Sequence, residues 1–195
     1  MNQQTTQPPK TKEQLREEML SRRSKLGAGE IDAKSAVIAM QIFNTEEFKN
    51  SKTIFTYASF SSEVSTNYFI KKALLLGKKI CIPKIDKKKN EMYAVAIRNL
   101  DSLKPNAIGI PEAGFLSFKV NPEKIGLIIV PASVFDLRGH RIGSGKGYYD
   151  KYLAQNRRAK AIGLAYDFQI VDRIMHEPHD IKVNKIITEK RFIDC

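Results

Sequence analysis

The sequence predicts an α/β fold, in which a mainly parallel open sheet carries helices on both faces in a Rossmann-like three-layer architecture. From residue 50 onward, short segments rich in β-branched and aromatic residues alternate with segments of helical periodicity, as in sheets whose strands are joined by helices. Residues 126–130 (GLIIV) form a continuous apolar run, which is typical of a parallel strand covered on both faces. A chain of 195 residues has the length of one such domain.

The first element expected is a basic helix. Thr11 and Gln14 form a capping-box pattern at its start, and Gly27 and Gly29 are expected to end it. Apolar residues such as Met19 share one stripe of this helix. Its basic residues are expected outside that stripe, and they are Lys12, Arg16, Arg22 and Arg23.

The remaining elements follow from the same periodicities. Helices are expected over residues 31–42, from apolar spacings of three and four, and between Thr66 as N-cap and Gly77 as stop. The expected strands cover residues 53–59, 79–83, 92–97, 126–130, 161–165 and 185–187. Polar residues 1–9, with two prolines, predict a disordered tail, which leaves residues 10–195 as a single α/β domain.

Composition narrows the class of protein. The 33 Lys and Arg against 21 Asp and Glu give a net charge of +12, which favours polyanionic partners such as nucleotides or nucleic acid, although part of the excess belongs to a solvated lysine surface. No uncharged stretch exceeds eleven residues, so no membrane span is expected. Two cysteines are too few for a disulfide framework or a four-ligand zinc site. We therefore expect a cytoplasmic protein that does not bind membranes.

The densest chemical signal is the glycine-rich segment 143–147 (GSGKG), which lies between the strand at 126–130 and a segment of helical character. Ligands of open α/β sheets bind beyond the carboxyl ends of strands, and glycines let backbone N–H groups approach an anion at a helix N-terminus. A Walker A loop needs Ser or Thr where Gly147 stands, and the dinucleotide fingerprint needs Gly where Tyr148 stands. The segment is therefore expected to bind phosphate in another way, with a flexible linker as the alternative.

Three residues open the helix that follows. Tyr148 and Tyr149 are adjacent, so on a helix they point about 100° apart. One of them is expected to pack in the core and the other to contact a ligand. Asp150 lies in the first turn, where a carboxylate either stabilises the helix N-terminus or binds a metal.

Several segments together resemble the 5-formyltetrahydrofolate cyclo-ligase family, also called 5,10-methenyltetrahydrofolate synthetase. The matching segments, in the order of the family, are KEQLREEMLSRR, ASFSSEVST, GIPEAG, RIGSGKGYYDKYL and EPHDIKVNKIIT. They run from Lys12 to Thr188 and so cover nearly the whole predicted domain. The ordered combination is specific, whereas none of the segments is decisive by itself.

The resemblance implies an ATP- and Mg²⁺-dependent ligase of one-carbon metabolism. In the family, ATP phosphorylates the formyl oxygen of 5-formyltetrahydrofolate, N10 attacks the activated carbon, and loss of phosphate leaves 5,10-methenyltetrahydrofolate. Such phosphoryl transfer depends on positioning and charge neutralisation, which agrees with the lack of a Ser-His-Asp or Cys-His set in the sequence. The implied partners are ATP and a reduced folate, whose polyglutamylated forms the positive charge would favour, and we expect a monomer that does not bind nucleic acid.

The resemblance also implies roles for particular residues. Arg141 and Lys146 would be the catalytic residues that stabilise the transferring phosphoryl group. Folate contacts are implied for Ala58, Glu63 and Tyr148, since a carboxylate such as that of Glu63 accepts hydrogen bonds from pterin N–H groups. Asp150 and Asp180 match the magnesium-associated carboxylates. The implied ATP-binding positions are Lys12, Arg16, Arg141, Ile142, Gly143, Ser144, Gly145, Lys146, Gly147, Tyr148 and Tyr149.

Two departures from the family pattern and two alternative functions remain. Ser144 stands where many family members have a larger or basic residue, and Asn184 replaces an Asp, which leaves Asp180 as the clearer metal ligand.

A basic nucleic-acid-binding protein is one alternative function, supported only by a lysine patch at Lys84 and 87–89. A sugar-phosphate isomerase of similar architecture is the other, because fold alone does not determine function.

Overall fold

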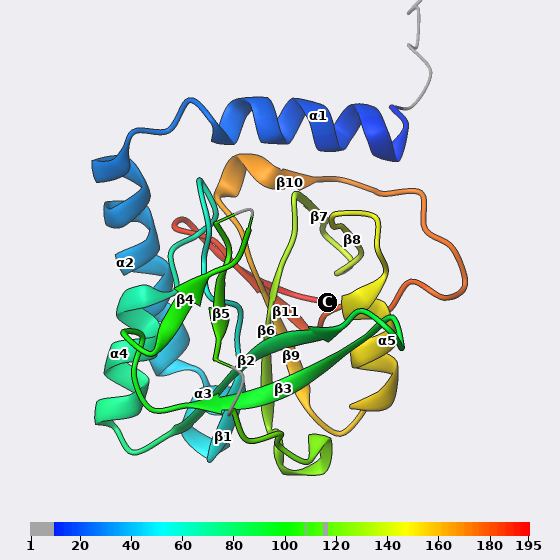
Figure 1. Ribbon diagram of the computed structural model, residues 1–195. Coiled ribbons are helices and arrows are strands. Elements are labelled where there is room, and N and C mark those ends of the chain that lie inside the picture. Colours follow the sequence, from blue (N-terminus) through cyan, green and yellow to red (C-terminus); the bar gives the residue numbers. More distant parts are fainter. Residues whose placement is uncertain (1–9, 108, 115–116) are drawn as a thin grey trace, which may run out of the picture.

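A computed structural model of the chain describes residues 10–107, 109–114 and 117–195, and the expected tail at 1–9 lies outside these residues. Its main sheet contains β1 (Thr53–Phe55), β2 (Lys79–Asp86), β3 (Glu91–Ile97), β6 (Leu127–Pro131), β9 (Lys160–Leu164), β11 (Lys185–Ile187) and β12 (Phe192–Asp194). The strand order is β12-β11-β9-β6-β1-β2-β3 (Figure 1). The five inner strands run parallel, and β12 and β3 pair antiparallel at the edges. The prediction of a mainly parallel open sheet is confirmed.

Helices cover both faces of this sheet. They are α1 (Lys12–Arg23), α2 (Ala28–Asn44), α3 (Glu46–Asn50), α4 (Asn67–Leu75) and α5 (Tyr148–Gln155), with 3₁₀ turns at Pro122–Lys124 and Asp167–Gln169. In Figure 1, α2 and α4 lie to the left of the strands and α5 to the right. Within the described residues, none of the helices has both the length and the apolar character needed to cross a bilayer.

The two faces have separate cores, as strand alternation requires. Ile54 packs with α2, α3 and α4 in one cluster, whereas the next residue, Phe55, packs with α5 in the other. The residues from Leu127 to Val130 alternate in the same way, and all four are fully buried. The continuous apolar run of the sequence therefore marks a strand covered on both faces, as predicted.

A small second sheet lies under α1 and carries the start of the glycine-rich segment. Its strands, in the order β10-β7-β8, are Ile170–Val171, Val134–Asp136 and Arg141–Ile142. Met19 of α1 packs on Val134 and Ile142 of this sheet. Figure 1 shows α1 crossing above these strands. Residues 141 and 142, expected in a loop, thus form a strand that ties the glycine-rich segment to α1.

Several element boundaries differ from the prediction, and the differences at the ends of α1 and of β1 are the largest in their effect on the fold. The capping box at Thr11 is present, but α1 ends at Arg23, and Gly27 is the N-cap of α2. Gly29 therefore lies inside α2, because the amide of Ile31 bonds to the carbonyl oxygen of Gly27 and starts a new helix there. The expected strand over 53–59 ends at residue 55, since the chain beyond it turns into a loop.

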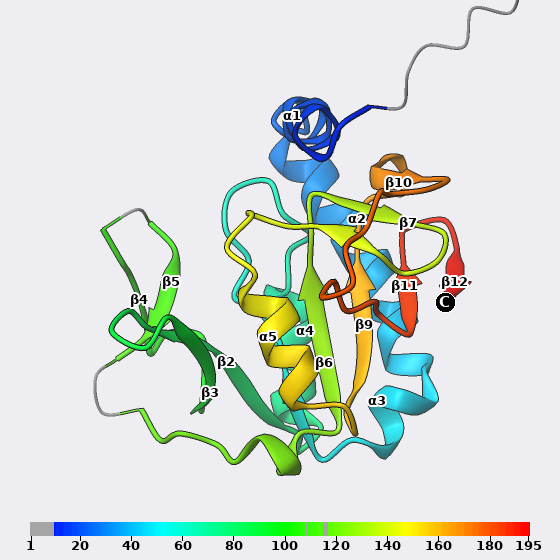
Figure 2. The ribbon, with the colours of Figure 1, turned by 90° about the vertical axis from the view of Figure 1, so that its right-hand side faces the viewer.

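A further hairpin stands beside the main sheet. Strands β4 (Leu103–Pro105) and β5 (Pro111–Ala113) pair antiparallel, and Figure 2 shows them projecting away from the central strands. Neither strand was predicted, because each contains only three residues and a proline.

Candidate active site

The basic start of α1 lies against the glycine-rich segment. Lys12 and Arg16 are four residues apart and face the same side of the helix. Arg16 Nε donates a hydrogen bond to the carbonyl oxygen of Gly143 at 2.9 Å, and Lys12 Nζ lies 2.8 Å from Asp180 Oδ2. The structure therefore brings together three segments that are far apart in the sequence, two of which carry predicted nucleotide positions and the third the predicted metal ligand Asp180.

The glycine-rich segment is an exposed turn between β8 and α5. Gly145 and Gly147 have φ angles of +83° and +66°, in the left-handed region that favours glycine, and Gly147 is the N-cap of α5. The side chains of Ser144 and Lys146 are exposed. In the part of the chain that the structure describes, Lys146 forms no ion pair, so its charge is available to an anion. Ile142, by contrast, is buried against α1 and holds the turn in place.

Arg141 lies at the base of this turn in a second ion pair. It is buried in β8, its Nη2 lies 2.7 Å from Asp150 Oδ1, and its Nη1 donates to the carbonyl oxygen of Ile181. The amide of Ile181 donates to the same Asp150 oxygen at 3.1 Å. Burial lowers the pKa of Arg141, and Asp150 opposes that shift. Because a guanidinium has five N–H donors, this pairing positions Arg141 and still leaves it donors for a phosphate oxygen.

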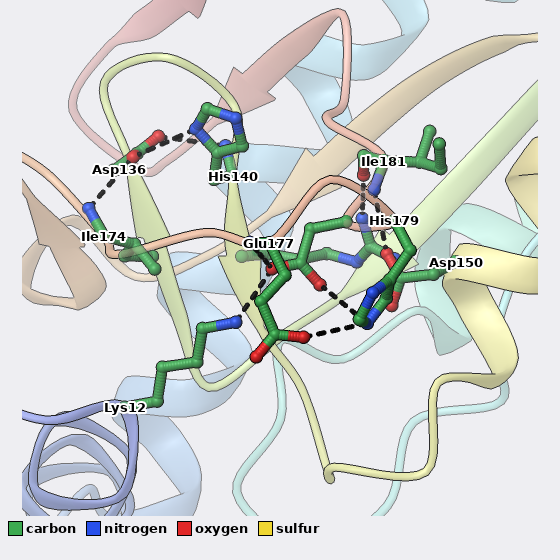
Figure 3. A network of polar contacts seen from close by, with 10 residues as sticks. Lys12, Asp136, His140, Asp150, Ile174, Glu177, His179 and Ile181 are labelled. Carbon is green, nitrogen blue, oxygen red and sulfur yellow. Dashed lines mark hydrogen bonds and ion pairs between the residues drawn. The ribbon is translucent and has the colours of Figure 1, made fainter.

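The hairpin that carries Arg141 is fixed by the fully buried Asp136 (Figure 3). Asp136 Oδ1 accepts hydrogen bonds from the amides of Arg138 and His140, each at 2.9 Å. Its Oδ2 accepts from the amide of Ile174 at 3.0 Å. This carboxylate closes the β7–β8 turn and sets the direction in which β8 enters the glycine-rich segment.

The two aspartates predicted to bind Mg²⁺ come from different segments that meet at Ile181. Asp180 directly precedes Ile181 in the chain, and Asp150 of α5 accepts a hydrogen bond from the Ile181 amide. Each already pairs with a cation, Asp150 with Arg141 and Asp180 with Lys12, and Figure 3 shows Asp150, Ile181 and Lys12 in this network. Among residues 10–107, 109–114 and 117–195, no group of three or more His, Cys, Asp or Glu side chains could hold a metal ion. Mg²⁺ usually binds through one or two carboxylates together with phosphates and water. The two aspartates fit a metal carried by a nucleotide, and not a site built from protein ligands alone.

Glu63, the predicted folate contact, lies in the loop between β1 and α4. Reciprocal hydrogen bonds between the backbone and hydroxyl groups of Ser59 and Thr66 close this loop, at 3.1 and 3.2 Å. Glu63 Oε2 accepts from the amide of Phe60 at 3.0 Å, and Tyr166 Oη donates to the carbonyl oxygen of Glu63 at 3.0 Å. Glu63 Oε1 has no hydrogen-bond partner among the described residues. The loop is thus held by neutral groups and presents one free carboxylate oxygen.

Arg23 is a residue of this region that the sequence analysis missed. It was expected outside the apolar stripe of α1, and this is wrong: Arg23 is only 7% exposed, with its Nε 3.4 Å from Ser62 Oγ. No acidic side chain in the described ranges forms an ion pair with it. Burial raises the pKa of the Glu63 carboxyl, whereas the amide of Phe60 and the charge of Arg23 lower it. The spacing of four residues from Met19 was the signal, since it puts Arg23 on the buried stripe.

Tyr149 lies between the glycine-rich segment and the Glu63 loop. Its ring packs edge-on against Phe55, with centroids 6.3 Å apart, and its hydroxyl is buried without a hydrogen-bond partner among the described residues. Burial raises the pKa of Tyr149, the charge of Glu63 raises it further, and Arg141 lowers it. The hydroxyl is therefore within electrostatic reach of both regions.

The other predicted folate contacts lie near these residues. Tyr148 and Tyr149 both pack against the core on the α5 side and both are half-buried, so the expectation that only one would pack is wrong. Ala58 is buried and lines a cavity between α4 and the β4–β5 hairpin.

Comparisons with known proteins agree with one another. The model of the 5-formyltetrahydrofolate cyclo-ligase family matches residues 8–189. The 5-formyltetrahydrofolate cyclo-ligase of Mus musculus is 31% identical, over 90% of this chain and 92% of its own length. The NMR structure of the Aquifex aeolicus 5,10-methenyltetrahydrofolate synthetase has a TM-score of 0.82 at 32% identity and covers 94% of this chain and 92% of that chain. A Mycoplasma pneumoniae 5,10-methenyltetrahydrofolate synthetase gives a TM-score of 0.74 at 26% identity, over 91% of this chain and 98% of that one.

These matches include every segment that forms the site described above, from α1 to β11. They favour the ligase interpretation over the nucleic-acid-binding and isomerase alternatives, because the similarity extends over the whole of α1, the Glu63 loop and the glycine-rich segment. The chain belongs to the 5-formyltetrahydrofolate cyclo-ligase family of enzymes.

Proposed function

We propose that this chain converts 5-formyltetrahydrofolate to 5,10-methenyltetrahydrofolate and cleaves ATP to ADP and phosphate in the process. The observation that carries the proposal is the position of Tyr149, which directly follows the glycine-rich segment and packs against Phe55, the last residue of β1 before the Glu63 loop. A phosphoryl group that passes from a nucleotide to a folate requires the two binding regions to meet at one point. The names of the relatives state the folate reaction, and the glycine-rich segment supports ATP as the phosphoryl donor.

The reaction balances without a covalent bond to the protein. The formyl oxygen attacks the terminal phosphorus of ATP, and the bond to ADP breaks. N10 then attacks the formyl carbon and loses its proton, and the C–O bond breaks so that phosphate leaves with the former formyl oxygen. The protein positions the two substrates and neutralises the charge that moves between them.

The nucleotide region would supply the positive charge. Lys146 is the exposed cation of the glycine-rich segment and has no ion-pair partner in the ranges that the structure describes, and Arg141 approaches the same turn from β8. The N-terminal amides of α5 add partial positive charge. Mg²⁺, when bound, would supply further neutralisation at the phosphates, held by Asp150 and Asp180. Lys12 now pairs with Asp180 at 2.8 Å. If Asp180 held the metal ion, the Lys12 ammonium group would be released and could pair with a phosphate of the nucleotide.

The folate region would hold the pterin. Among the described residues, one carboxylate oxygen of Glu63 has no hydrogen-bond partner and the other accepts only from the amide of Phe60, so Glu63 is suited to adjacent N–H donors of a pterin. Arg23 favours the charged form of this carboxyl.

The test is the absorbance of 5,10-methenyltetrahydrofolate formed from 5-formyltetrahydrofolate, with and without ATP and Mg²⁺. Product is expected only when both are present. The matched pair of variants is Lys146→Ala and Lys151→Ala, because both remove one exposed lysine near the start of α5. Only Lys146→Ala should lose turnover. No product from the folded parent protein, or product without ATP, would contradict the proposal.

A further inference from the structure

The amino ends of the parallel strands form one edge of the main sheet, the amino edge, which lies opposite the Glu63 loop because that loop follows the carboxyl end of β1. Lys52 directly precedes β1, β2 begins with Lys79, and β9 begins with Lys160. These strands run parallel within one sheet, and neighbouring strands are only about 4.8 Å apart. Figure 2 shows the amino edge at the bottom and α1 at the top. The topology therefore gathers these lysines on one side of the molecule.

The unpaired charges of the amino edge are mainly positive. The exposed cations that begin or shortly precede β1, β2, β6 or β9, and that form no ion pair within the described ranges, are Lys52, Lys79, Lys124, Arg157, Arg158 and Lys160. Of the nearby carboxylates, Glu46 pairs with Lys49 at 2.8 Å. Glu47 pairs with Lys185 at 3.1 Å. Glu123 has no ion pair in the described part of the chain, and it is outnumbered by the cations around it.

Two exposed leucines lie at the same edge. Helix α4 runs from the Glu63 loop back to the amino edge, where Leu75 is its last residue and Leu76 its C-cap. Their side chains are 84% and 52% exposed. Gly77, with a φ of +74°, ends the helix and leads the chain into β2 through Lys78. Lys78 Nζ donates to the carbonyl oxygen of Lys49 in α3 at 2.8 Å, so the tip that carries the leucines is tied to α3.

Exposed aliphatic side chains among cations fit the surface of an anionic bilayer. Binding at such a surface increases with the apolar area that enters the headgroup boundary and with the attraction of Lys and Arg to anionic lipids. Each basic residue near the surface contributes a factor of about five in affinity. Bases of single-stranded nucleic acid stack on aromatic side chains, which leucines do not replace. The expectation that the chain does not bind membranes came from the lack of a long apolar stretch, which bears on spanning a bilayer and not on binding at its surface.

We propose that the amino edge binds the surface of anionic lipid bilayers, with Leu75 and Leu76 at the headgroup boundary and the surrounding cations against the lipid headgroups. The carboxyl edge with the Glu63 loop then faces away from the bilayer, so the bound protein keeps its candidate active site open to solution. This binding is a further function of the chain and does not depend on the proposed reaction.

The direct experiment is co-sedimentation of the whole chain with vesicles made of equal parts of phosphatidylcholine and phosphatidylserine, and with vesicles of phosphatidylcholine alone. Binding is expected only to the mixed vesicles at about 0.1 M salt, and it should be lost at about 1 M, where the Debye length falls from about 10 Å to about 3 Å. Leu75→Ser should weaken binding about tenfold, because burial of a leucine contributes at least that factor. Leu20→Ser is the matched control, since Leu20 is an exposed leucine of α1, and it should change binding less than twofold. Equal binding to both kinds of vesicle, or equal weakening by the two variants, would overturn the inference.

A charge-reversal comparison tests the place of binding. Lys52→Glu combined with Lys160→Glu should weaken vesicle binding at least tenfold. Lys87→Glu combined with Lys88→Glu changes the net charge equally, at exposed positions beyond the other end of β2, and should weaken it less than threefold. Equal losses would show that the overall charge attracts the lipid and would overturn the assignment to the amino edge. Failure of the parent to bind mixed vesicles, whether or not it binds a single-stranded oligonucleotide, would overturn the lipid assignment itself.

Discussion

The region proposed to bind the nucleotide and the region proposed to bind the folate are built in opposite ways. In the nucleotide region, charged groups are held by opposite charges, Lys12 by Asp180 and Arg141 by Asp150. In the proposed folate region, hydrogen bonds from uncharged donors hold Glu63 and its loop, and the buried cation Arg23 has no acidic partner among the described residues. Ion pairs can exchange partners with a charged ligand, whereas a loop closed by uncharged donors keeps its shape. Variants of the first region should therefore affect turnover, and variants of the second should affect folate affinity and its pH dependence.

The largest effect is expected from Lys146→Ala. Loss of one preorganised charge at a site of developing negative charge costs about 10²- to 10³-fold in kcat, and we expect a decrease in this range. Since Lys146 is exposed, the melting temperature should not change. Steady-state assays with Lys151→Ala as the control measure the difference. A decrease in kcat of less than threefold would show that Lys146 is not a catalytic residue.

Glu63→Gln should have the next largest effect, on the folate only. Hydrogen bonds to charged groups contribute about 1.5–3 kcal/mol, so KM for 5-formyltetrahydrofolate should rise at least about tenfold while KM for ATP stays the same. The measurement is a pair of titrations, each with the other substrate saturating. Equal increases in both KM values would show that Glu63 supports the whole site and not the pterin alone.

The same variant tests the ionisation of Glu63. Because the pKa of this carboxyl is raised above its ordinary value of 4.5, kcat/KM for folate should fall as the pH decreases through the raised pKa. Glu63→Gln should lack this acid limb. A folded-state pKa above the unfolded one also means that stability is lost as the pH rises through it. The melting temperature of Glu63→Gln relative to the parent should therefore increase from acid to neutral pH, and a constant difference would contradict the assignment.

A smaller effect is expected at Arg23. Arg23→Leu removes a charge that lowers the pKa of Glu63, so the acid limb should move to higher pH and kcat/KM near neutrality should fall about threefold. The acid limb of Arg23→Lys should lie at nearly the same pH as that of the parent. Arg22→Leu, at an exposed neighbouring position, should leave the pH of the acid limb unchanged. If Arg23→Leu lowers kcat/KM without moving the limb, Arg23 acts through packing only.

The smallest effect is expected at Lys12. Partly exposed ion pairs such as that with Asp180 contribute about 0.2–1 kcal/mol, which for a chain of this size corresponds to a melting temperature lowered by less than about 4 °C. Lys12→Ala should also raise KM for ATP two- to threefold. A thermal melt and an ATP titration measure both changes, and an unchanged KM would confine Lys12 to a structural ion pair.

Much of the fold follows from local periodicity. The run from Leu127 to Val130 is buried on both faces, and this alone distinguishes a central parallel strand from an edge strand. The capping box at Thr11 likewise marks the start of α1 through contacts within one turn. Such features are readable because all the interacting groups lie within a few residues.

The rest of the fold and site depends on contacts between distant segments. Lys12 meets Asp180 across 168 residues, and no local pattern specifies that pairing. Arg141 looks like a loop cation in the sequence, but the pairing of β8 with β7 buries it. Asn184, a departure from the family pattern, accepts a hydrogen bond from the amide of Ala161 at 2.8 Å and so joins β9 to β11. The glycine-rich segment was recognisable because glycine and charge are visible locally, whereas its partners are not.

The division of the site into two regions is tested most directly by calorimetric binding of each substrate alone. A non-hydrolysable ATP analogue with Mg²⁺, and 5-formyltetrahydrofolate without nucleotide, are titrated into the parent, Lys146→Ala and Glu63→Gln proteins. Lys146→Ala should lose affinity for the analogue and keep that for the folate, and Glu63→Gln should do the reverse. If each variant weakened both ligands equally, or if the two effects were exchanged, the two regions would not be the separate binding sites described here.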